Sequence, residues 1–90
     1  MTNESWKKLK AFFFELDFEA PVDTIAQFRL ADGYSFEGRL YTMSYVERDD
    51  GENETAATIE ILSEGESRLD TFALSEFAWA KFNDREWKDE

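Results

Sequence analysis

The densest group of side chains that could do chemistry lies between Glu47 and Glu54, in the sequence Glu-Arg-Asp-Asp-Gly-Glu-Asn-Glu. Its carboxylates suggest a calcium loop first, because Ca²⁺ prefers oxygen ligands. The EF-hand spacing D-x-[DN]-x-[DN]-G is not met, and no downstream glutamate stands at the required offset. We therefore interpret the segment as a solvated hairpin loop, and we predict no metal and no cofactor.

Arrangements typical of catalysis are also missing from the sequence. The chain has no cysteine and no histidine, so it lacks a thiolate nucleophile and the commonest general base. Ser5-Trp6-Lys7-Lys8 matches the letters S-x-x-K, but it falls at the exposed start of a predicted helix. The four glycines are scattered and form no phosphate loop, and nothing singles out a carboxylate pair for a hydrolase. We predict that the protein is not an enzyme.

The net charge of −11 is unevenly placed along the chain. Residues 1–14 hold three lysines and one glutamate, a sum of +2, whereas residues 15–90 hold seven basic and twenty acidic side chains, a sum of −13. The negative electrostatic field of residues 15–90 repels phosphate backbones, so we expect no direct nucleic-acid binding. The acids serve solubility, or they face a basic protein partner. No run approaches a membrane span and the N-terminus lacks a signal-peptide core, which favours a cytoplasmic protein without a membrane partner.

The spacing of hydrophobic residues along the chain predicts the helix and strands that carry the charged side chains. Ala26, Phe28 and Leu30 alternate with polar residues up to the turn at Asp32-Gly33, and alternation resumes behind it, as in a β-hairpin. We predict a single domain over residues 1–90, and its expected elements are a helix at about 4–18, strands at about 24–31, 34–46, 55–62, 68–74 and 77–82, and a charged tail at 83–90 that is frayed except where Trp87 docks.

The helix at 4–18 is amphipathic and is expected to pack on the sheet. Its apolar stripe has the spacing i, i+3, i+7 and i+10 and comprises Trp6, Leu9, Phe13 and Leu16. Three further phenylalanines widen this stripe, so that more than one side of the helix could be covered: Phe12, Phe14 and Phe18. Asn3 or Ser5 is the expected N-cap.

In the long second strand, predicted at 34–46, the alternation of apolar and polar residues shifts by one position part-way along. Its apolar residues are even-numbered up to Leu40 and odd-numbered from Tyr41. This predicts a β-bulge at that point, with Gly38 permitting a sharp bend just before it. A bent, bulged strand can serve two faces of a small barrel.

The segment from Ser75 to Phe82 fits two structures. Leu74, Phe77, Ala78 and Phe82 fit helical spacing, with Ser75 as an N-cap. A short fifth strand at 77–82 is the favoured interpretation, because four strands with one long bent member need a partner at an open edge. The alternative fold is a four-stranded antiparallel sheet with N- and C-terminal helices.

The stretch Phe28–Leu40, Phe-Arg-Leu-Ala-Asp-Gly-Tyr-Ser-Phe-Glu-Gly-Arg-Leu, resembles the first motif of Sm-like proteins, and Phe72–Phe77 is similar to the junction of their last two strands. The resemblance implies a mainly β, α+β fold: an N-terminal helix and a five-stranded, strongly bent antiparallel barrel of the SH3/Sm-like type. The RNA-contacting Asp-x-x-x-Asn has no match at Tyr45 to Asp50, and the second motif's Arg-Gly is missing. The resemblance therefore does not carry RNA binding over to this chain.

The excess of aromatic residues over what a small core needs predicts a non-enzymatic protein-interaction or regulatory module, with a homo-oligomer as one form of it. The alternative is a phage-type acidic inhibitor that imitates nucleic acid on a basic DNA- or RNA-binding protein, and an Sm-like RNA binder is a third hypothesis that the charge disfavours. The expected interaction surface comprises Tyr41, Tyr45, Glu47, Asp49, Asp50, Glu52, Glu54, Trp79 and Trp87.

Overall fold

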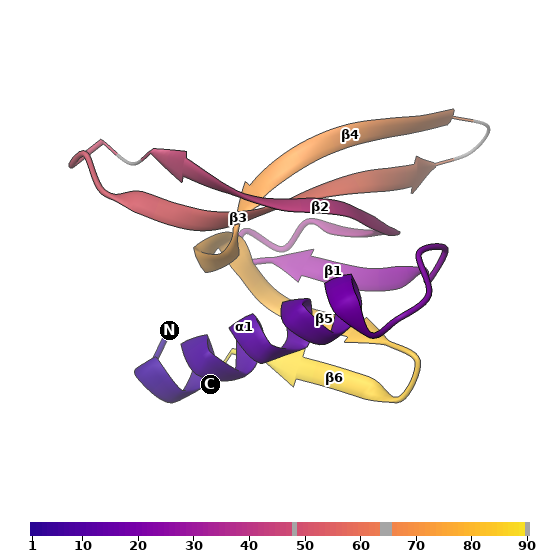
Figure 1. The fold of residues 1–90 in the computed structure, drawn as a ribbon, viewed down its shortest axis with the longest axis horizontal. Coiled ribbons are helices and arrows are strands. Elements are labelled where there is room, and N and C mark those ends of the chain that lie inside the picture. The colour runs from indigo at the N-terminus through magenta and orange to yellow at the C-terminus, as the bar shows by residue number, and fades with distance from the viewer. Residues whose placement is uncertain (48, 64–65, 90) are drawn as a thin grey trace.

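The computed structural model describes residues 1–47, 49–63 and 66–89, and it shows one α-helix packed on an antiparallel sheet (Figure 1). In chain order the elements are α1 (Asn3–Phe18), β1 (Ala26–Leu30), β2 (Ser35–Glu47), β3 (Asn53–Ser63), β4 (Glu66–Ala73), the 3₁₀ turn η1 (Leu74–Glu76), β5 (Phe77–Phe82) and β6 (Arg85–Lys88). The expected α+β class with an N-terminal helix is confirmed. No helix in the described part of the chain is long and apolar enough to cross a membrane.

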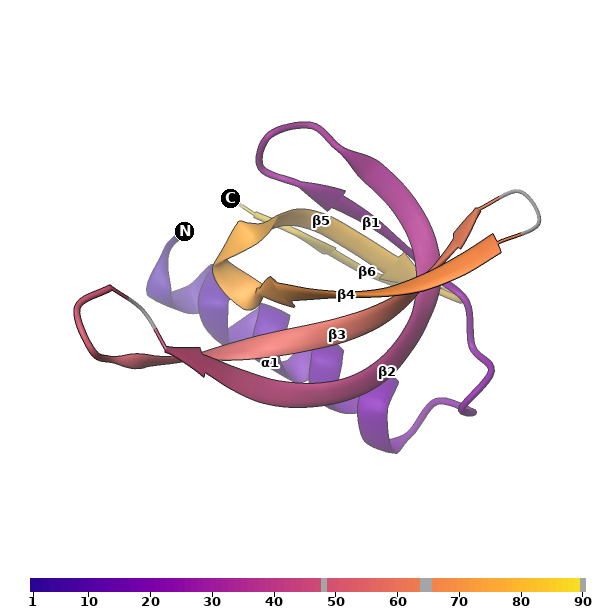
Figure 2. The same cartoon turned by 90° about the horizontal axis from the view of Figure 1, so that it is seen from above.

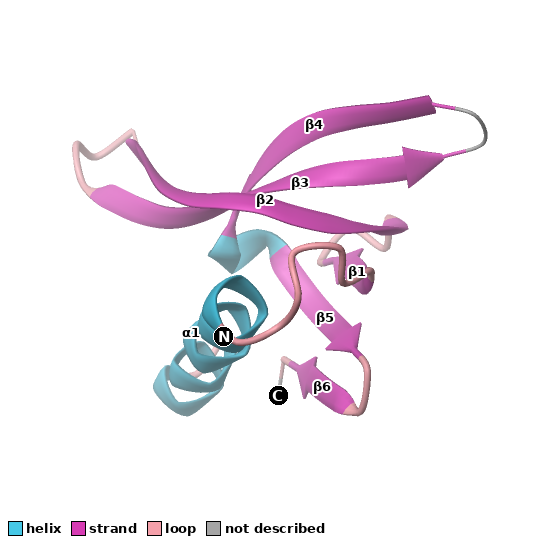
Figure 3. Ribbon diagram, turned by 45° about the vertical axis from the view of Figure 1, so that its right-hand side comes forward, coloured by secondary structure: helices cyan, strands magenta, loops and turns pink. Residues whose placement is uncertain are grey.

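The sheet has six strands and is open, so the prediction of a five-stranded barrel is wrong in strand number and in closure. The strand order is β4-β3-β2-β1-β5-β6. β5 pairs with β1 on one side and with β6 on the other, which leaves β5 no side to which β4 could add. Instead of closing, the sheet bends: β2, β3 and β4 form an upper layer, and β5, β6 and α1 lie below it (Figures 1 and 3). Seen from above, β2 curves over α1 (Figure 2).

The core lies between α1 and the sheet and consists largely of phenylalanine rings. Phe13 is 1% exposed, and its ring centroid lies 5.2 Å from that of Phe77 in β5 and 6.0 Å from that of Phe28 in β1. Leu9 and Leu16 of α1 are buried in the same cluster. The predicted packing of the helix on the sheet is thus confirmed.

Thr2 caps α1, not Asn3 or Ser5 as the sequence suggested. The Thr2 hydroxyl accepts a hydrogen bond from the Ser5 N–H at 3.0 Å, because the helix begins one residue earlier than expected. Ser5 is instead buried, and its carbonyl oxygen accepts a hydrogen bond from the Trp87 indole N–H at 3.0 Å.

The predicted hairpin at Gly33 is confirmed. β1 and β2 pair antiparallel around the turn, and the Gly33 N–H donates to the Leu30 carbonyl oxygen at 2.9 Å. Gly33 has φ +94°, a conformation that residues with a side chain rarely adopt. The Asp32 carboxylate accepts the Tyr34 N–H at 2.9 Å, which fixes the turn further.

The predicted bulge in β2 is also confirmed. The pairing register between β2 and β3 shifts between Leu40 and Thr42, which leaves Tyr41 as the extra residue. Just before the bulge, Gly38 is paired with Ala26 of β1 on one side and with Ile61 of β3 on the other. The strand therefore bends where it is held from both sides.

The fifth strand occupies the predicted residues 77–82, so the alternative fold with a C-terminal helix is wrong. The helical spacing there reflects only η1, in which the Glu76 carboxylate accepts the Ala73 N–H at 2.8 Å and Ser75 is not the N-cap. The strands predicted at 55–62 and 68–74 correspond to β3 and β4. Of the turn predicted between them, residues 64–65 lie outside the described residues.

The prediction of a frayed tail at 83–90 is wrong for residues 83–89, and residue 90 lies outside the described residues. Asn83 takes φ 51°, a turn conformation that asparagine tolerates, and the chain reverses into β6. Trp87 of β6 is 4% exposed, so its expected docking is confirmed. A four-residue strand with three charged side chains gives little signal in the sequence, and a buried indole with a bonded N–H holds it in place.

Candidate functional site

α1 carries a second stripe of large side chains beside its buried one. Trp6, Lys10, Phe14 and Phe18 follow one another at intervals of four residues, which places them along one side of the helix. Phe14 and Phe18 are 57% and 71% exposed, and their ring centroids lie 4.7 Å apart. The ammonium nitrogen of Lys10 lies 5.8 Å from the centroid of the Trp6 ring. Trp6 is half-buried and packs against the core, so we call Lys10, Phe14 and Phe18 alone the exposed stripe.

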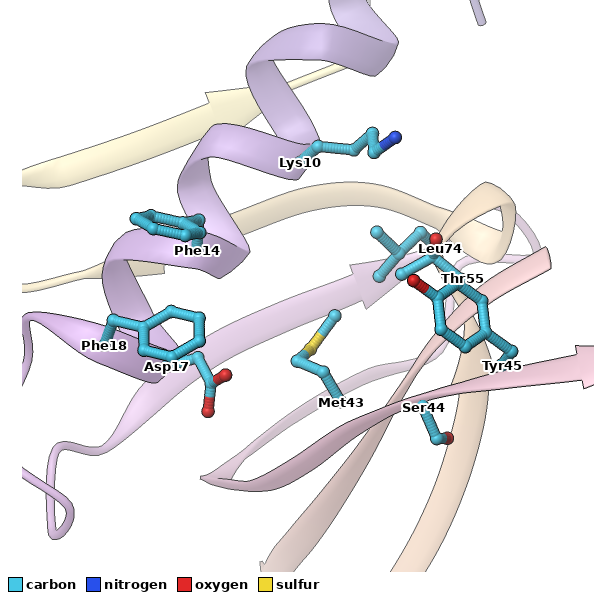
Figure 4. A pocket seen from close by; sticks show the side chains of 9 residues that line it. All are labelled: Lys10, Phe14, Asp17, Phe18, Met43, Ser44, Tyr45, Thr55 and Leu74. Atoms are coloured by element: carbon cyan, nitrogen blue, oxygen red, sulfur yellow. The ribbon is translucent and has the colours of Figure 1, made fainter.

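The exposed stripe forms one wall of a groove whose other wall is β2 (Figure 4). Met43 and Tyr45 of β2 lie across the groove from Phe14 and Phe18, and Tyr45 is 73% exposed. The groove has a volume of about 380 Å³. We call it the α1–β2 groove, and its lining side chains are Lys10, Phe14, Asp17, Phe18, Met43, Ser44, Tyr45, Thr55 and Leu74.

A second hollow of about 380 Å³ continues the α1–β2 groove toward the start of the helix. It lies between Trp6 of α1 and the first residues of β3, and it shares Lys10 and Thr55 with the first hollow. From Trp6 to Phe18 the helix rises by about 18 Å, at 1.5 Å per residue. The two hollows together can take an elongated ligand such as a helix of three to four turns.

The chemistry of the groove is that of an apolar contact surface. The charged side chains that line it are Lys10 and Asp17, which stand two helical turns apart. Across residues 1–47, 49–63 and 66–89, no group of three or more acids is placed to hold a metal ion. Open apolar walls with a cation at one end and an anion at the other suit recognition of an amphipathic segment.

Of the aromatic residues expected at the surface, Tyr45 lies in the groove. Tyr41 is 66% exposed but lines a separate shallow hollow of about 240 Å³ beside Val22 and Leu40. Trp87 is buried against α1, so its assignment to the surface is wrong. The structure therefore does not bring the predicted aromatic residues together.

Trp79 is half-buried on β5 and does not line the groove. Its indole N–H donates to the Glu86 carboxylate at 2.6 Å, and the Arg29 guanidinium lies 5.7 Å from the ring centroid. The hydrogen bond from Trp79 lowers the pKa of the Glu86 carboxyl below its ordinary value, and the positive charges of Lys88 and Lys81 lower it further. The Trp79 side chain thus already contacts Glu86 of β6 and Arg29 of β1 within the same molecule.

The predicted acidic residues gather at the end of the β2–β3 hairpin. Glu47, Asp49, Asp50 and Glu54 surround a shallow hollow together with Glu76 of η1. Glu52, the remaining acid of the predicted set, is exposed in the same hairpin, where its N–H donates to the Asp50 carboxylate at 3.0 Å.

Among the described residues, acids elsewhere do not extend this cluster into one continuous face. Some form ion pairs on other strands and on the helix, namely Arg39–Glu60, Arg68–Asp70 and Arg85–Glu15. Others stand exposed at separate turns, such as Asp32 in the β1–β2 turn and Asp84 before β6. The described carboxylates of the predicted set are therefore gathered at the hairpin end, and those elsewhere are separate or paired with arginines.

Sequence reasoning missed Phe14 and Phe18 as surface residues, because it counted them as part of a widened core stripe. The signal that could have separated them is the four-residue interval from Trp6 through Lys10 to Phe18. A stripe that contains a lysine at its second position is a poor candidate for the core face.

Comparison of the chain with protein-family models, with curated proteins and with solved structures finds no match. The resemblance to Sm-like and SH3-like proteins therefore stays a prediction from the sequence. What the structure shows is the coarser feature, a small antiparallel sheet with an N-terminal helix. The groove itself is the basis for a functional proposal.

Proposed function

We propose that this protein is a non-enzymatic interaction module that binds a protein partner in the α1–β2 groove. The observation that carries this proposal is that Phe14, Phe18 and Tyr45, each more than half exposed, line the same groove. Single exposed apolar residues are ordinary, whereas a contiguous apolar patch rimmed by polar residues is typical of a binding site.

The size of the patch suits a reversible complex. Covering the exposed parts of three aromatic side chains removes on the order of 300 Å² of apolar surface from water. At about 25 cal/mol per Å², this gives a gross gain of about 7 kcal/mol, which the loss of translational and rotational freedom then reduces. Further contacts along the groove would have to supply the rest of a stable complex.

The test is affinity capture from the native lysate with the wild-type protein and with the double variant Phe14→Ala/Phe18→Ala. We expect proteins bound by the wild type to be lost with the double variant and retained with the control Tyr41→Ala, which removes an equally exposed ring outside the groove. Isothermal titration of each purified partner should give the same ranking. Equal binding by all three proteins would refute the proposal.

The acidic hairpin end supports a second candidate, an inhibitor that imitates nucleic acid. Its carboxylates could stand in for phosphates on a basic protein, with Glu47, Asp49 and Asp50 as the nearest equivalents. If so, neutralising these three with Glu47→Gln, Asp49→Asn and Asp50→Asn should abolish capture of nucleic-acid-binding proteins, and double-stranded DNA should displace those proteins from the wild type. Capture that DNA does not displace would count against mimicry.

A further inference from the structure

We propose that the partner in the α1–β2 groove is a second copy of this chain, with the two α1 helices antiparallel about a two-fold axis beside Phe14. The inference rests on the proposed function, because it names the occupant of the same groove. It is argued from the order of charges along α1 and from the charge of the rest of the molecule.

The charges of α1 are divided between its two halves. The first half holds Lys7, Lys8 and Lys10 against Glu4, whereas the second half holds only acids, Glu15 and Asp17, of which Glu15 is paired with Arg85. Reversing such a helix against itself places each basic half beside an acidic half. A parallel arrangement would instead oppose like charges.

The groove residues fit the same two-fold axis. Lys10 and Asp17 both line the groove and are seven residues apart, so a two-fold axis midway between them brings Lys10 of each copy level with Asp17 of the other. Phe14 stands next to that midpoint, and its 57% exposed ring would meet the same ring of the second copy. The same two-fold axis thus allows a contact between the two Phe14 rings at the centre and two ion pairs between Lys10 and Asp17, one on each side.

The net charge of the molecule favours this contact over others between copies. Each copy carries a net charge of −11, so most encounters between two copies are repulsive. Residues 1–14, with a sum of +2, form the basic end of the chain, and an attractive encounter brings this end against acids of the other copy. In the C-terminal half of α1, Asp17 offers such an acid beside Phe14 and Phe18.

The experiment is sedimentation equilibrium of the full chain over a range of concentrations, with circular dichroism to show that each variant is folded. We expect a dimer for the wild type and about tenfold weaker dimerisation for Lys10→Glu and for Asp17→Lys, because each change makes two attractive contacts repulsive. An equimolar mixture of these two variants should form a heterodimer of near wild-type affinity, since both contacts become attractive again. Lys81→Glu, which makes the same charge change on β5, is the control and should dimerise like the wild type.

Three outcomes would overturn the proposal. A monomer at every concentration would do so, as would equal weakening by Lys10→Glu and Lys81→Glu. A dimer that survives both groove variants would instead indicate pairing through the open edge of β4. If the wild type is monomeric but captured partners still depend on Phe14 and Phe18, the self-association fails and the proposed interaction function stands.

Discussion

Replacing Gly38 with alanine is expected to lower the free energy of unfolding by about 3 kcal/mol, a large share of the about 5–13 kcal/mol that a domain of this length has. A Cβ atom at this position would overlap the backbone carbonyl oxygen of Glu60 and would lie 2.9 Å from Cγ2 of Ile59. The obstacle is main chain in the neighbouring strand, so the sheet itself would have to move. Urea denaturation followed by tryptophan fluorescence measures the change.

Gly51 provides the matched control for this prediction. It has φ +84°, and no atom lies within 4 Å of the position that a Cβ atom would take, so alanine there meets backbone strain but no overlap. We expect Gly51→Ala to cost about 1 kcal/mol. A loss at Gly51 equal to or larger than the loss at Gly38 would show that the close approach of β2 and β3 does not require glycine.

The second large effect is expected for Phe13→Ala, with a loss of about 4 kcal/mol in the free energy of unfolding. The Phe13 ring is 1% exposed and touches rings from α1, β1 and β5, so its removal leaves a cavity bounded by separate elements. The same denaturation experiment measures it. Because the rings around it come from three elements, we expect the cavity to collapse only in part.

The neighbouring residue is the natural comparison. Phe14→Ala removes the same side chain from a position that is 57% exposed, and at concentrations where the chain is monomeric we expect a change below about 0.5 kcal/mol. The pair therefore separates the buried stripe of α1 from its exposed stripe. Similar losses at Phe13 and Phe14 would contradict the orientation of α1 and would remove the exposed wall of the groove.

The sequence predicted the features that depend on neighbouring residues. The turn at Gly33 follows from Asp-Gly between two alternating runs, and the bulge follows from the change of phase at Leu40. Both signals are local, because a strand of period two shows directly which side chains share a face. The strand at 77–82 was favoured for a different reason, the need of an open sheet edge for a partner.

The sequence did not predict that the sheet stays open, because the pairing partner of β5 depends on contacts between segments far apart in the chain. Whether β5 pairs with β4 or with β6 is decided by Trp87, which finds a buried site and a hydrogen-bond acceptor at Ser5. Nothing in the sequence of Arg85–Lys88 shows that acceptor. A short charged strand is stabilised by tertiary contacts, and propensity alone does not indicate it.

The candidate groove could be predicted only in part. Tyr45 was expected at the surface, but Phe14 and Phe18 were not. α1 offers two apolar stripes, and the one that faces the sheet is decided by the fit of Phe13 against Phe28 and Phe77. Ring packing of this kind is a property of the assembled fold, so the sequence left both orientations open.

The contact between Trp87 and Ser5 joins residues that are 82 positions apart in the chain. During synthesis, the phenylalanines of α1 are made before β5 and β6, which complete their cover. The hairpins of β2, β3 and β4 can pair before then, since their contacts are close in sequence. α1 is therefore translated before these strands but reaches its final surroundings only with them, and its core-facing rings remain accessible to chaperones until β5 and β6 emerge.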